Sequence, residues 1–295
     1  MKLTNRFDLP EPFVKAVSMD DYVRGDADYT ASQLVKPDRI DKYTKQHWEE
    51  MEEDVSDRLW AFQGQTKHIV LERIAKSNPE RYFVEQRWST MLGKKKISAM
   101  SDLFDKETRI LYDWKETSVW KFILGDTREW EEQANINLFL MRVNDYQVDK
   151  LINVAMLKDW KARLARTTKR EDYPQCALHV MPLPMWSVGE AQDFINKKIA
   201  MREESGDNPP VCTKRERWQR DAVYALMKKG NKRAIRLYDN KDQAEGVARF
   251  REASAKPGEK FYIEERPTEP VRCLDFCPVQ QWCDFGRKAA EQWRE

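Results

Sequence analysis

The chain has 295 residues, and 41% of them are hydrophobic, including 11 Trp, 12 Phe and 10 Tyr, which is enough for one large domain or a core with a small appendage. Its 52 basic and 50 acidic residues leave a net charge of +2, so any nucleic-acid contact must come from local patches rather than from the overall charge. No segment approaches the ~20 apolar residues of a membrane helix, and residues 1–5 lack the apolar region of a signal peptide, so we expect a cytoplasmic protein without membrane contacts.

The predicted elements of the central region follow the order helix, three strands, helix, strand. The first helix has apolar residues at helical spacing and stops before Pro79, and short turn-forming segments separate the strands. Thr127 is the expected N-cap of the second helix. Ser187, followed three residues later by Glu190, begins a further helix that ends near Glu204. The central segments are residues 64–78, 82–90, 96–104, 109–115, 127–143 and 148–157.

We expect three parts in this α/β chain. Residues 1–60 form a helical N-terminal segment, residues 61–205 form the core, and residues 206–295 form a C-terminal subdomain with a cluster of cysteines. In that last part, residues 223–227 and 234–238 read as two strands around a tight basic turn. The turn can contact a nucleic-acid backbone, although a solvated hairpin tip explains the same charges. The candidate phosphate-binding residues are Lys228, Lys229, Lys232 and Arg233.

Polar side chains of the core occur where neighbouring elements can bring them together. Asp102 lies near the end of the second strand, and Asp113 and Lys115 lie on the third. If these strands pair as a hairpin, the two carboxylates approach each other at its open end, and alternation places Asp113 and Lys115 on one face. A helix packed on that face can present His68, and the following helix carries Gln133.

This combination of side chains suits metal-dependent hydrolysis. Two carboxylates and an imidazole are good ligands for Mg²⁺ or Mn²⁺, which stabilises charge on a phosphodiester and makes a bound water more acidic. Lys115 can hold or deprotonate the attacking water, and Gln133 can orient Lys115 or a phosphate. Each residue alone has a simpler explanation. His68 can be a satisfied helix histidine, Glu85 an exposed strand carboxylate, and Gln133 a plain polar helix residue.

The Asp-x-Lys tripeptide alone is weak evidence, because it occurs three times, beginning at Asp113, Asp159 and Asp239. For an Asp-x-Lys tripeptide taken without its context, a solvated strand end is a better interpretation than a catalytic site. Only the first copy follows an aspartate on the preceding strand and a histidine on the preceding helix, and only it precedes a glutamine helix. We therefore predict a catalytic role for the first copy and structural roles for the others.

In their order along the chain, these residues resemble the motifs of the PD-(D/E)XK superfamily. The resemblance is to its RecB-type branch, including CRISPR-associated RecB-like exonucleases and phage relatives, and it implies a restriction-endonuclease-like core. The residues that carry it are Gly64-x3-His68, Glu85, Asp102, Asp113-x-Lys115 and Gln133. It implies that His68, Asp102, Asp113 and the Trp114 carbonyl bind the metal. Lys115 is then the catalytic lysine, with Glu85 and Gln133 beside it. Many members have a tyrosine four residues after the glutamine; this chain has Asn137, to which no role is transferred.

The cysteines form a second group. Cys273, Cys277 and Cys283 lie on one short segment, and a zinc ion or an iron–sulfur cluster requires a fourth ligand. Cys212 follows two prolines at the start of a segment, whereas Cys176 lies beside a predicted strand, so Cys212 is the better fourth ligand. Iron–sulfur nucleases of the RecB-like type carry a similar clasp, and the resemblance therefore implies a [4Fe-4S] cluster, with structural Zn²⁺ as the alternative.

Taken together, the residues and the resemblance predict a Mg²⁺- or Mn²⁺-dependent deoxyribonuclease from a bacterial or phage-infected cell. Its expected substrate is DNA that is single-stranded or has free ends, and the expected reaction is exonucleolytic. Recombination, repair and phage DNA metabolism are compatible roles, with a helicase or recombination protein as a candidate partner. The alternatives are a non-catalytic nucleic-acid-binding or scaffold subunit and a CRISPR spacer-processing nuclease.

Overall fold

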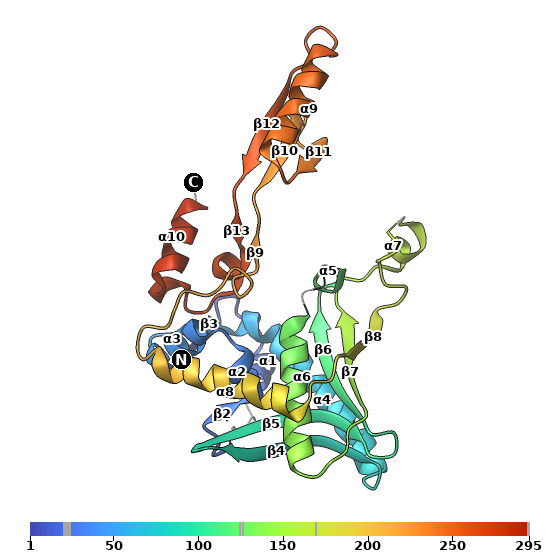
Figure 1. Ribbon diagram of the computed structural model, residues 1–295, viewed down its shortest axis with the longest axis vertical. Coiled ribbons are helices and arrows are strands. Elements are labelled where there is room, and N and C mark those ends of the chain that lie inside the picture. Colours follow the sequence, from blue (N-terminus) through green and yellow to red (C-terminus); the bar gives the residue numbers. More distant parts are fainter. Residues whose placement is uncertain (20–24, 124, 126, 169, 294–295) are drawn as a thin grey trace. The chain divides into compact units, whose positions relative to one another are not determined.

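The computed structural model describes residues 1–19, 25–123, 125, 127–168 and 170–293, without the side chains of residues 60, 67 and 68. The chain divides into two compact units (Figure 1). The first contains residues 1–36 and 47–207, and the second contains residues 37–46 and 208–295. Within the described ranges, no helix is long and apolar enough to cross a membrane.

Six strands among the described residues of the first unit form one mixed sheet. Its path is β2-β5-β6-β7-β8, and β4 pairs with β5. The β2–β5 and β6–β7 pairs are parallel and the other pairs are antiparallel, so the unit belongs to the mixed α/β class. The strands are β2 Tyr29–Thr30, β4 Tyr82–Leu92, β5 Lys95–Asp105, β6 Ile110–Thr117, β7 Lys150–Leu157 and β8 Leu178–Leu183. The four predicted core strands are confirmed within a few residues at each end.

Helix α6 (Arg128–Val143) connects the parallel strands β6 and β7, which cannot be joined by a tight turn. It contacts β4, β5 and β7 as well as helices α2 and α8 (Figure 1). Residues 134–141 are all buried, as expected for a helix covered on more than one side. The predicted helix is confirmed, but the Thr127 side chain makes no capping hydrogen bond. Its backbone is not in the extended conformation that is typical of a capping residue. Its carbonyl accepts hydrogen bonds from the N–H groups of Trp130 and Glu131.

Helix α8 (Val188–Glu204) begins with the predicted capping box. Glu190 N–H donates to Ser187 Oγ at 3.2 Å, and Ser187 N–H donates to Glu190 Oε2 at 2.7 Å. These two bonds satisfy backbone donors that a helix start leaves without partners. The predicted start and end of this helix are confirmed.

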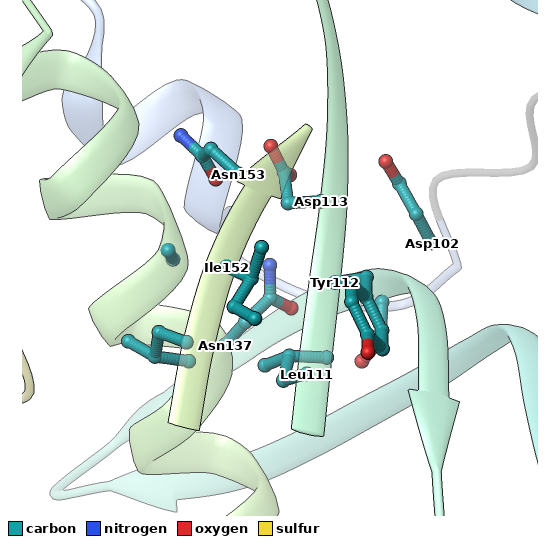
Figure 2. A pocket seen from close by; sticks show the side chains of 10 residues that line it. Asp102, Leu111, Tyr112, Asp113, Asn137, Ile152 and Asn153 are labelled. Carbon is teal, nitrogen blue, oxygen red and sulfur yellow. The ribbon is translucent and has the colours of Figure 1, made fainter. Parts of the chain in front are cut away.

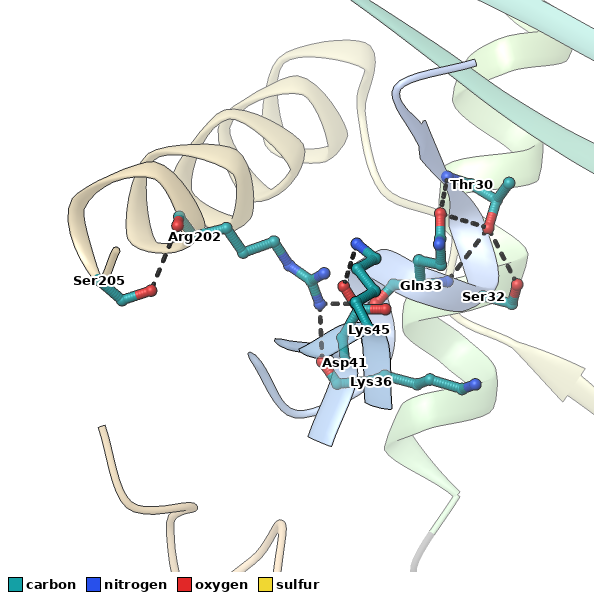
Figure 3. A network of polar contacts seen from close by, with 8 residues as sticks. All are labelled: Thr30, Ser32, Gln33, Lys36, Asp41, Lys45, Arg202 and Ser205. Atoms are coloured by element: carbon teal, nitrogen blue, oxygen red, sulfur yellow. Dashed lines mark hydrogen bonds and ion pairs between the residues drawn. The ribbon is translucent and has the colours of Figure 1, made fainter. Parts of the chain in front are cut away.

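Near its end, α8 is tied to helix α2 (Ala31–Val35), as Figure 3 shows. Arg202 Nη2 donates to the Gln33 carbonyl at 2.6 Å and to the Lys36 carbonyl at 3.0 Å. Thr30 and Gln33 form a second capping box at the start of α2. A cation at the last carbonyls of a short helix stabilises an end that would otherwise face water. The short helix is thereby fixed at both ends.

The rest of the first unit is shorter and less regular. The N-terminal segment is not purely helical, because β1 and β3 pair in parallel and β2 joins the main sheet. These strands have two or three residues each, too few to show an alternating pattern in the sequence. The remaining elements are β1 Lys2–Thr4, α1 Glu11–Ser18, β3 Glu52–Asp54, η1 Val55–Arg58, α4 Leu59–Ser77, α5 Val119–Ile123 and α7 Ala162–Thr167.

The second unit contains a small antiparallel sheet in the order β11-β10-β12, covered by helix α9. Leu226, Tyr238, Ala244 and Ala248 form its core. The predicted strands β10 and β11 are confirmed, although β11 is shorter than expected. The sequence interpretation missed α9 and β12. The elements are α3 Asp38–Gln46, β9 Gln219–Arg220, β10 Val223–Lys228, β11 Arg236–Tyr238, α9 Lys241–Ala253, β12 Phe261–Arg266, β13 Glu269–Pro270, η2 Arg272–Phe276, η3 Gln280–Trp282 and α10 Asp284–Gln292.

Candidate active site

The two predicted aspartates lie where the β5–β6 hairpin opens. The antiparallel ladder runs from Asp105–Ile110 to Leu103–Tyr112, and one step further in the same register Asp102 lies opposite Asp113. Asp102 Oδ2 accepts a hydrogen bond from the Trp114 N–H at 2.8 Å. The predicted hairpin is therefore confirmed. Asp102 lies inside β5 rather than at its end, because β5 continues along β4 on its other side.

Glu85 lies opposite Asp102 on the other neighbouring strand. The β4–β5 ladder pairs Val84 with Leu103 and Gln86 with Ser101, which places Glu85 at the level of Asp102. The φ angle of Glu85 is 51°, in the left-handed region that residues with a Cβ avoid. This conformation costs roughly 1–2 kcal/mol, and such strain concentrates at functional sites. The three predicted carboxylates thus occupy one level of three adjacent strands.

We predict that Glu85→Gly unfolds at a higher urea concentration than Glu85→Ala. Alanine retains the left-handed strain, whereas glycine adopts this φ without cost, so glycine should be more stable by about 1 kcal/mol. The matched control is Gln86, the exposed neighbour on β4. There the order should reverse, because glycine in an ordinary strand is less stable than alanine by about 0.5–1 kcal/mol. The same order at both positions would contradict a strained backbone at Glu85.

Lys115 lies between Asp113 and Gln133. Its Nζ is 3.1 Å from Asp113 Oδ1 and 2.9 Å from Asp113 Oδ2, and it donates to Gln133 Oε1 at 2.9 Å. Alternation along β6 places the aspartate and the lysine on one face, and Gln133 comes from the first turns of α6. The predicted proximity of these three side chains is confirmed.

The environment of Lys115 keeps its ammonium charged. Burial alone lowers the pKa of an ammonium, but the charges of Asp113 and Asp102 and the hydrogen bond to Asp113 outweigh it. The net result is a pKa of Lys115 above its usual value. At neutral pH Lys115 is therefore a cation that can hold an anion or a water.

The remaining predicted metal ligands are less well described. His68 falls within α4, but its side chain lies outside the described part of the chain. Trp114 separates Asp113 from Lys115 on β6. Among the described residues, no group of three or more His, Cys, Asp or Glu is arranged as a metal site. Asp113 Oδ2 nevertheless accepts no hydrogen bond and has only its ion pair with Lys115. Carboxylate oxygens such as those of Asp102 and Asp113 are the donors that a hard cation prefers.

Sequence reasoning missed Asn153 and gave no role to Asn137, and both asparagines lie beside Asp113. Asn137 on α6 and Asn153 on β7 are buried, and both line a cavity of about 10 Å³ with Asp102 and Asp113 (Figure 2). Asn153 is opposite Asp113 in the parallel β6–β7 register. The available signal for Asn153 was its position as a polar residue inside the apolar segment 151–157, since a buried polar side chain is more informative than a buried apolar one.

The other two Asp-x-Lys tripeptides have structural roles. Asp159 accepts from the Ser118 hydroxyl and from the Val119 N–H, both at 2.7 Å, at the start of α5. Asn240, in the third copy, is the N-cap of α9, where its side chain accepts from the Gln243 N–H at 2.9 Å. Hydrogen bonds to the first backbone N–H groups of a helix are a common use of such side chains.

In the second unit, the four predicted cysteines line one cavity of about 20 Å³, namely Cys212, Cys273, Cys277 and Cys283. Cys176 belongs to the first unit and is exposed, with its thiol 2.6 Å from the Leu178 carbonyl. Within the described part of the chain, the sulfurs of the four cysteines that line the cavity are not arranged as a metal-ligand set. The donor set itself, four thiols around one small cavity, fits zinc or an iron–sulfur cluster.

Burial, with smaller contributions from neighbouring charges, raises the pKa values of three of these thiols. Burial is the main cause, and the pKa of Cys212 rises to about 12 and that of Cys273 to about 11, with a smaller rise for Cys277. These thiols are therefore protonated at neutral pH unless a cation replaces the protons. Binding of a metal to this cavity would release protons and would strengthen as the pH rises. Arg39 also donates to Cys283 Sγ at 3.6 Å.

The predicted basic turn lies between β10 and β11. Lys229, Lys232 and Arg233 are exposed. Lys228 forms an ion pair with Glu259 at 2.6 Å, which offsets its charge. Three of the four candidate phosphate-binding residues therefore present an exposed cation. Lys228 is the weakest candidate of the four.

The comparisons with known proteins add little to this geometry. No protein-family model and no curated protein matches the chain. Among solved structures, the chain is similar to the one described as "Crystal structure of SSO0001", with a TM-score of 0.48 and 16% sequence identity, over 70% of this chain and 89% of that chain. A similarity of this size supports no argument about function. The fold and the site thus define a mixed α/β protein with a partly buried Asp-Lys-Gln cluster.

Proposed function

We propose that the chain is a Mg²⁺- or Mn²⁺-dependent deoxyribonuclease with a PD-(D/E)XK core. One observation carries the proposal: the Lys115 ammonium contacts both Asp113 and Gln133 where the β5–β6 hairpin opens, with Asp102 opposite. The element order α4-β4-β5-β6-α5-α6-β7 also supports this type of core. A lysine that only stabilised the fold would need one carboxylate partner, whereas the charges of both Asp113 and Asp102 act on Lys115.

Asp102 and Asp113 would hold the cation, with the Trp114 carbonyl and His68 as further ligands. The bound cation supplies charge stabilisation at the phosphodiester and a more acidic water. Asp102 also holds the backbone between Asp113 and Lys115 through its bond to the Trp114 N–H. The spacing of the metal ligand and the lysine is therefore fixed by the backbone as well as by the side chains.

Lys115 would place the attacking water and offset charge on the phosphate. Its ammonium is 2.9 Å from Asp113 Oδ2, and a charged lysine at this position stabilises negative charge on the phosphate electrostatically. Gln133 fixes the position of the ammonium by accepting one of its hydrogen bonds. Glu85, at the level of Asp102, would orient a ligand or a water beside the cation.

DNA is the proposed substrate, cleaved exonucleolytically from single-stranded ends. This preference for free single-stranded ends rests on the family resemblance alone. A [4Fe-4S] cluster bound by the four cysteines of the second unit is the proposed structural clasp, with zinc as the alternative.

Cleavage of labelled DNA that requires Mg²⁺ or Mn²⁺ and stops with EDTA tests the function. Salt-sensitive DNA binding without any cleavage would favour a non-catalytic binding subunit instead.

Binding to single-stranded DNA should depend on salt and on the basic turn. Each phosphate contact contributes about 0.7 to the slope of log K against log salt on single strands. The double variant Lys232→Ala/Arg233→Ala should therefore reduce the slope by about 1.4 and weaken binding for every sequence alike. Fluorescence anisotropy at several salt concentrations measures both effects.

The matched control is Arg163→Ala/Arg166→Ala, which removes two exposed cations from α7. That variant should bind DNA as wild type does. Equal salt slopes for wild type and the basic-turn variant would remove this turn from the DNA-binding surface.

A further inference from the structure

Asn137 and Asn153 place polar atoms without partners next to Asp113. Asn137 is 3% exposed and Asn153 is fully buried. Within the described part of the chain, Asn137 Oδ1, both amide atoms of Asn153 and Asp113 Oδ2 make no hydrogen bond. All three residues line the same cavity, and Figure 2 shows Asn153 beside Asp113 with Asn137 approaching from α6. Buried polar groups in native proteins almost always have a partner, so several of them around one space indicate a shared one.

The size and polarity of the cavity fit one water molecule. Its volume of about 10 Å³ is close to the minimum that a water requires, and buried waters usually make two to four hydrogen bonds. A water can accept from Asn153 Nδ2 and donate to Asn137 Oδ1 and Asp113 Oδ2. A Mg²⁺ ion fits less well, because it usually keeps several of its waters and a cavity of about 10 Å³ has no room for them.

We propose that a buried water bridges Asn137, Asn153 and Asp113 and that the two asparagines are positioning residues for the Asp113 carboxylate. The water holds Oδ2, and the Lys115 ammonium donates to Oδ1, so the carboxylate has one orientation. The functional part of this inference rests on the proposed nuclease activity, in which Asp113 binds the cation. Partners of metal ligands typically affect metal affinity or activity by about 10–100-fold.

The test is Asn153→Leu, which keeps the size of the side chain and removes its polar atoms. If the water is present, the variant removes its anchor and leaves Asn137 Oδ1 and Asp113 Oδ2 without this hydrogen bond, and the melting temperature should fall by about 3 °C or more. Mn²⁺ affinity, measured by calorimetry, should fall by about 10–100-fold. kcat should fall while KM for DNA stays within about twofold, since no DNA contact is removed.

The matched control is Asn135→Leu on α6, a fully buried asparagine whose amide is satisfied by protein groups. Asn135 Nδ2 donates to the carbonyls of Glu131 and Pro184, and its Oδ1 accepts from the Trp186 N–H. Asn135→Leu should destabilise the protein and leave the Mn²⁺ affinity of the folded protein unchanged. The comparison separates loss of stability from loss of Asp113 positioning.

A high-resolution crystal structure of the wild-type protein covers the case in which Asn153→Leu does not fold. Density for a water within hydrogen-bond distance of both asparagines and Asp113 would support the inference. Amides that bond only to protein groups, or an Asn153→Leu variant at least as stable as wild type, would overturn it. If wild type shows this water but neither binds Mn²⁺ nor cleaves DNA, the proposed function fails and the positioning role fails with it, while the buried water stands.

Discussion

Lys115→Ala should lower kcat for Mn²⁺-dependent DNA cleavage by about 10²–10³-fold, the range typical of removing one group that stabilises charge in the transition state. The variant removes the cation that contacts Asp113 and Gln133. Asp113→Ala should abolish cleavage as well, because it removes a proposed metal ligand together with the anchor of Lys115. Steady-state cleavage of an end-labelled single strand measures both effects, and circular dichroism checks that each variant is folded.

Asp239→Ala and Lys241→Ala are the matched controls, since they alter another copy of the Asp-x-Lys tripeptide. Both residues are exposed; Asp239 lies just before α9 and Lys241 is its first residue. Both should cleave at the wild-type rate. Lys115→Ala should also lose some stability, because it leaves the buried Asp113 carboxylate without its ion pair, at a cost of about 3–5 kcal/mol. A folded Lys115→Ala protein with wild-type activity would show that the assigned site is wrong.

Cys283→Ser should remove the proposed metal cluster and unfold much of the second unit. Protein purified without oxygen should be brown and contain about four iron atoms per chain, and the variant should be colourless. Metal binding to four thiolates contributes directly to folding, on the order of 10 kcal/mol for structural zinc in small domains. The melting temperature should therefore fall steeply, and nuclease activity should fall only as an indirect consequence. Metal analysis and calorimetry of the anaerobic protein measure these changes.

The matched control is Cys176→Ser, an exposed cysteine of the first unit. It should keep the colour, the metal content and the melting temperature of wild type. Colourless protein with one zinc per chain would replace the iron–sulfur cluster with a structural zinc. Protein without metal, combined with a Cys283→Ser variant as stable as wild type, would remove the clasp from the account.

The sequence predicted the elements whose patterns are long and local. The strands around Asp113 have alternating or continuous apolar residues, and the Ser187–Glu190 capping box lies directly before its helix. The register that places Asp102 opposite Asp113 followed from the short turn between their strands. These features depend on neighbours along the chain, which are visible without the fold.

Other features depend on tertiary contacts that no local pattern encodes. The left-handed backbone at Glu85 has no glycine to mark it. Asn137 acquires its significance only because β7 brings Asn153 beside Asp113. Helix α9 was missed because its apolar face is narrow and its residues are largely polar. The choice of Cys212 over Cys176 agrees with the cavity that it shares with the other three cysteines, although the metal itself stays a prediction.

The central claim is metal-dependent cleavage of DNA by the Lys115 site. The most direct measurement incubates single-stranded DNA, labelled at either end, with wild-type and Lys115→Ala protein in Mg²⁺, in Mn²⁺ and in excess EDTA. Wild type should shorten the DNA progressively with either metal and not at all with EDTA, and the variant should shorten it almost not at all. Equal cleavage by both proteins, or no cleavage by folded wild type under any condition, would contradict it.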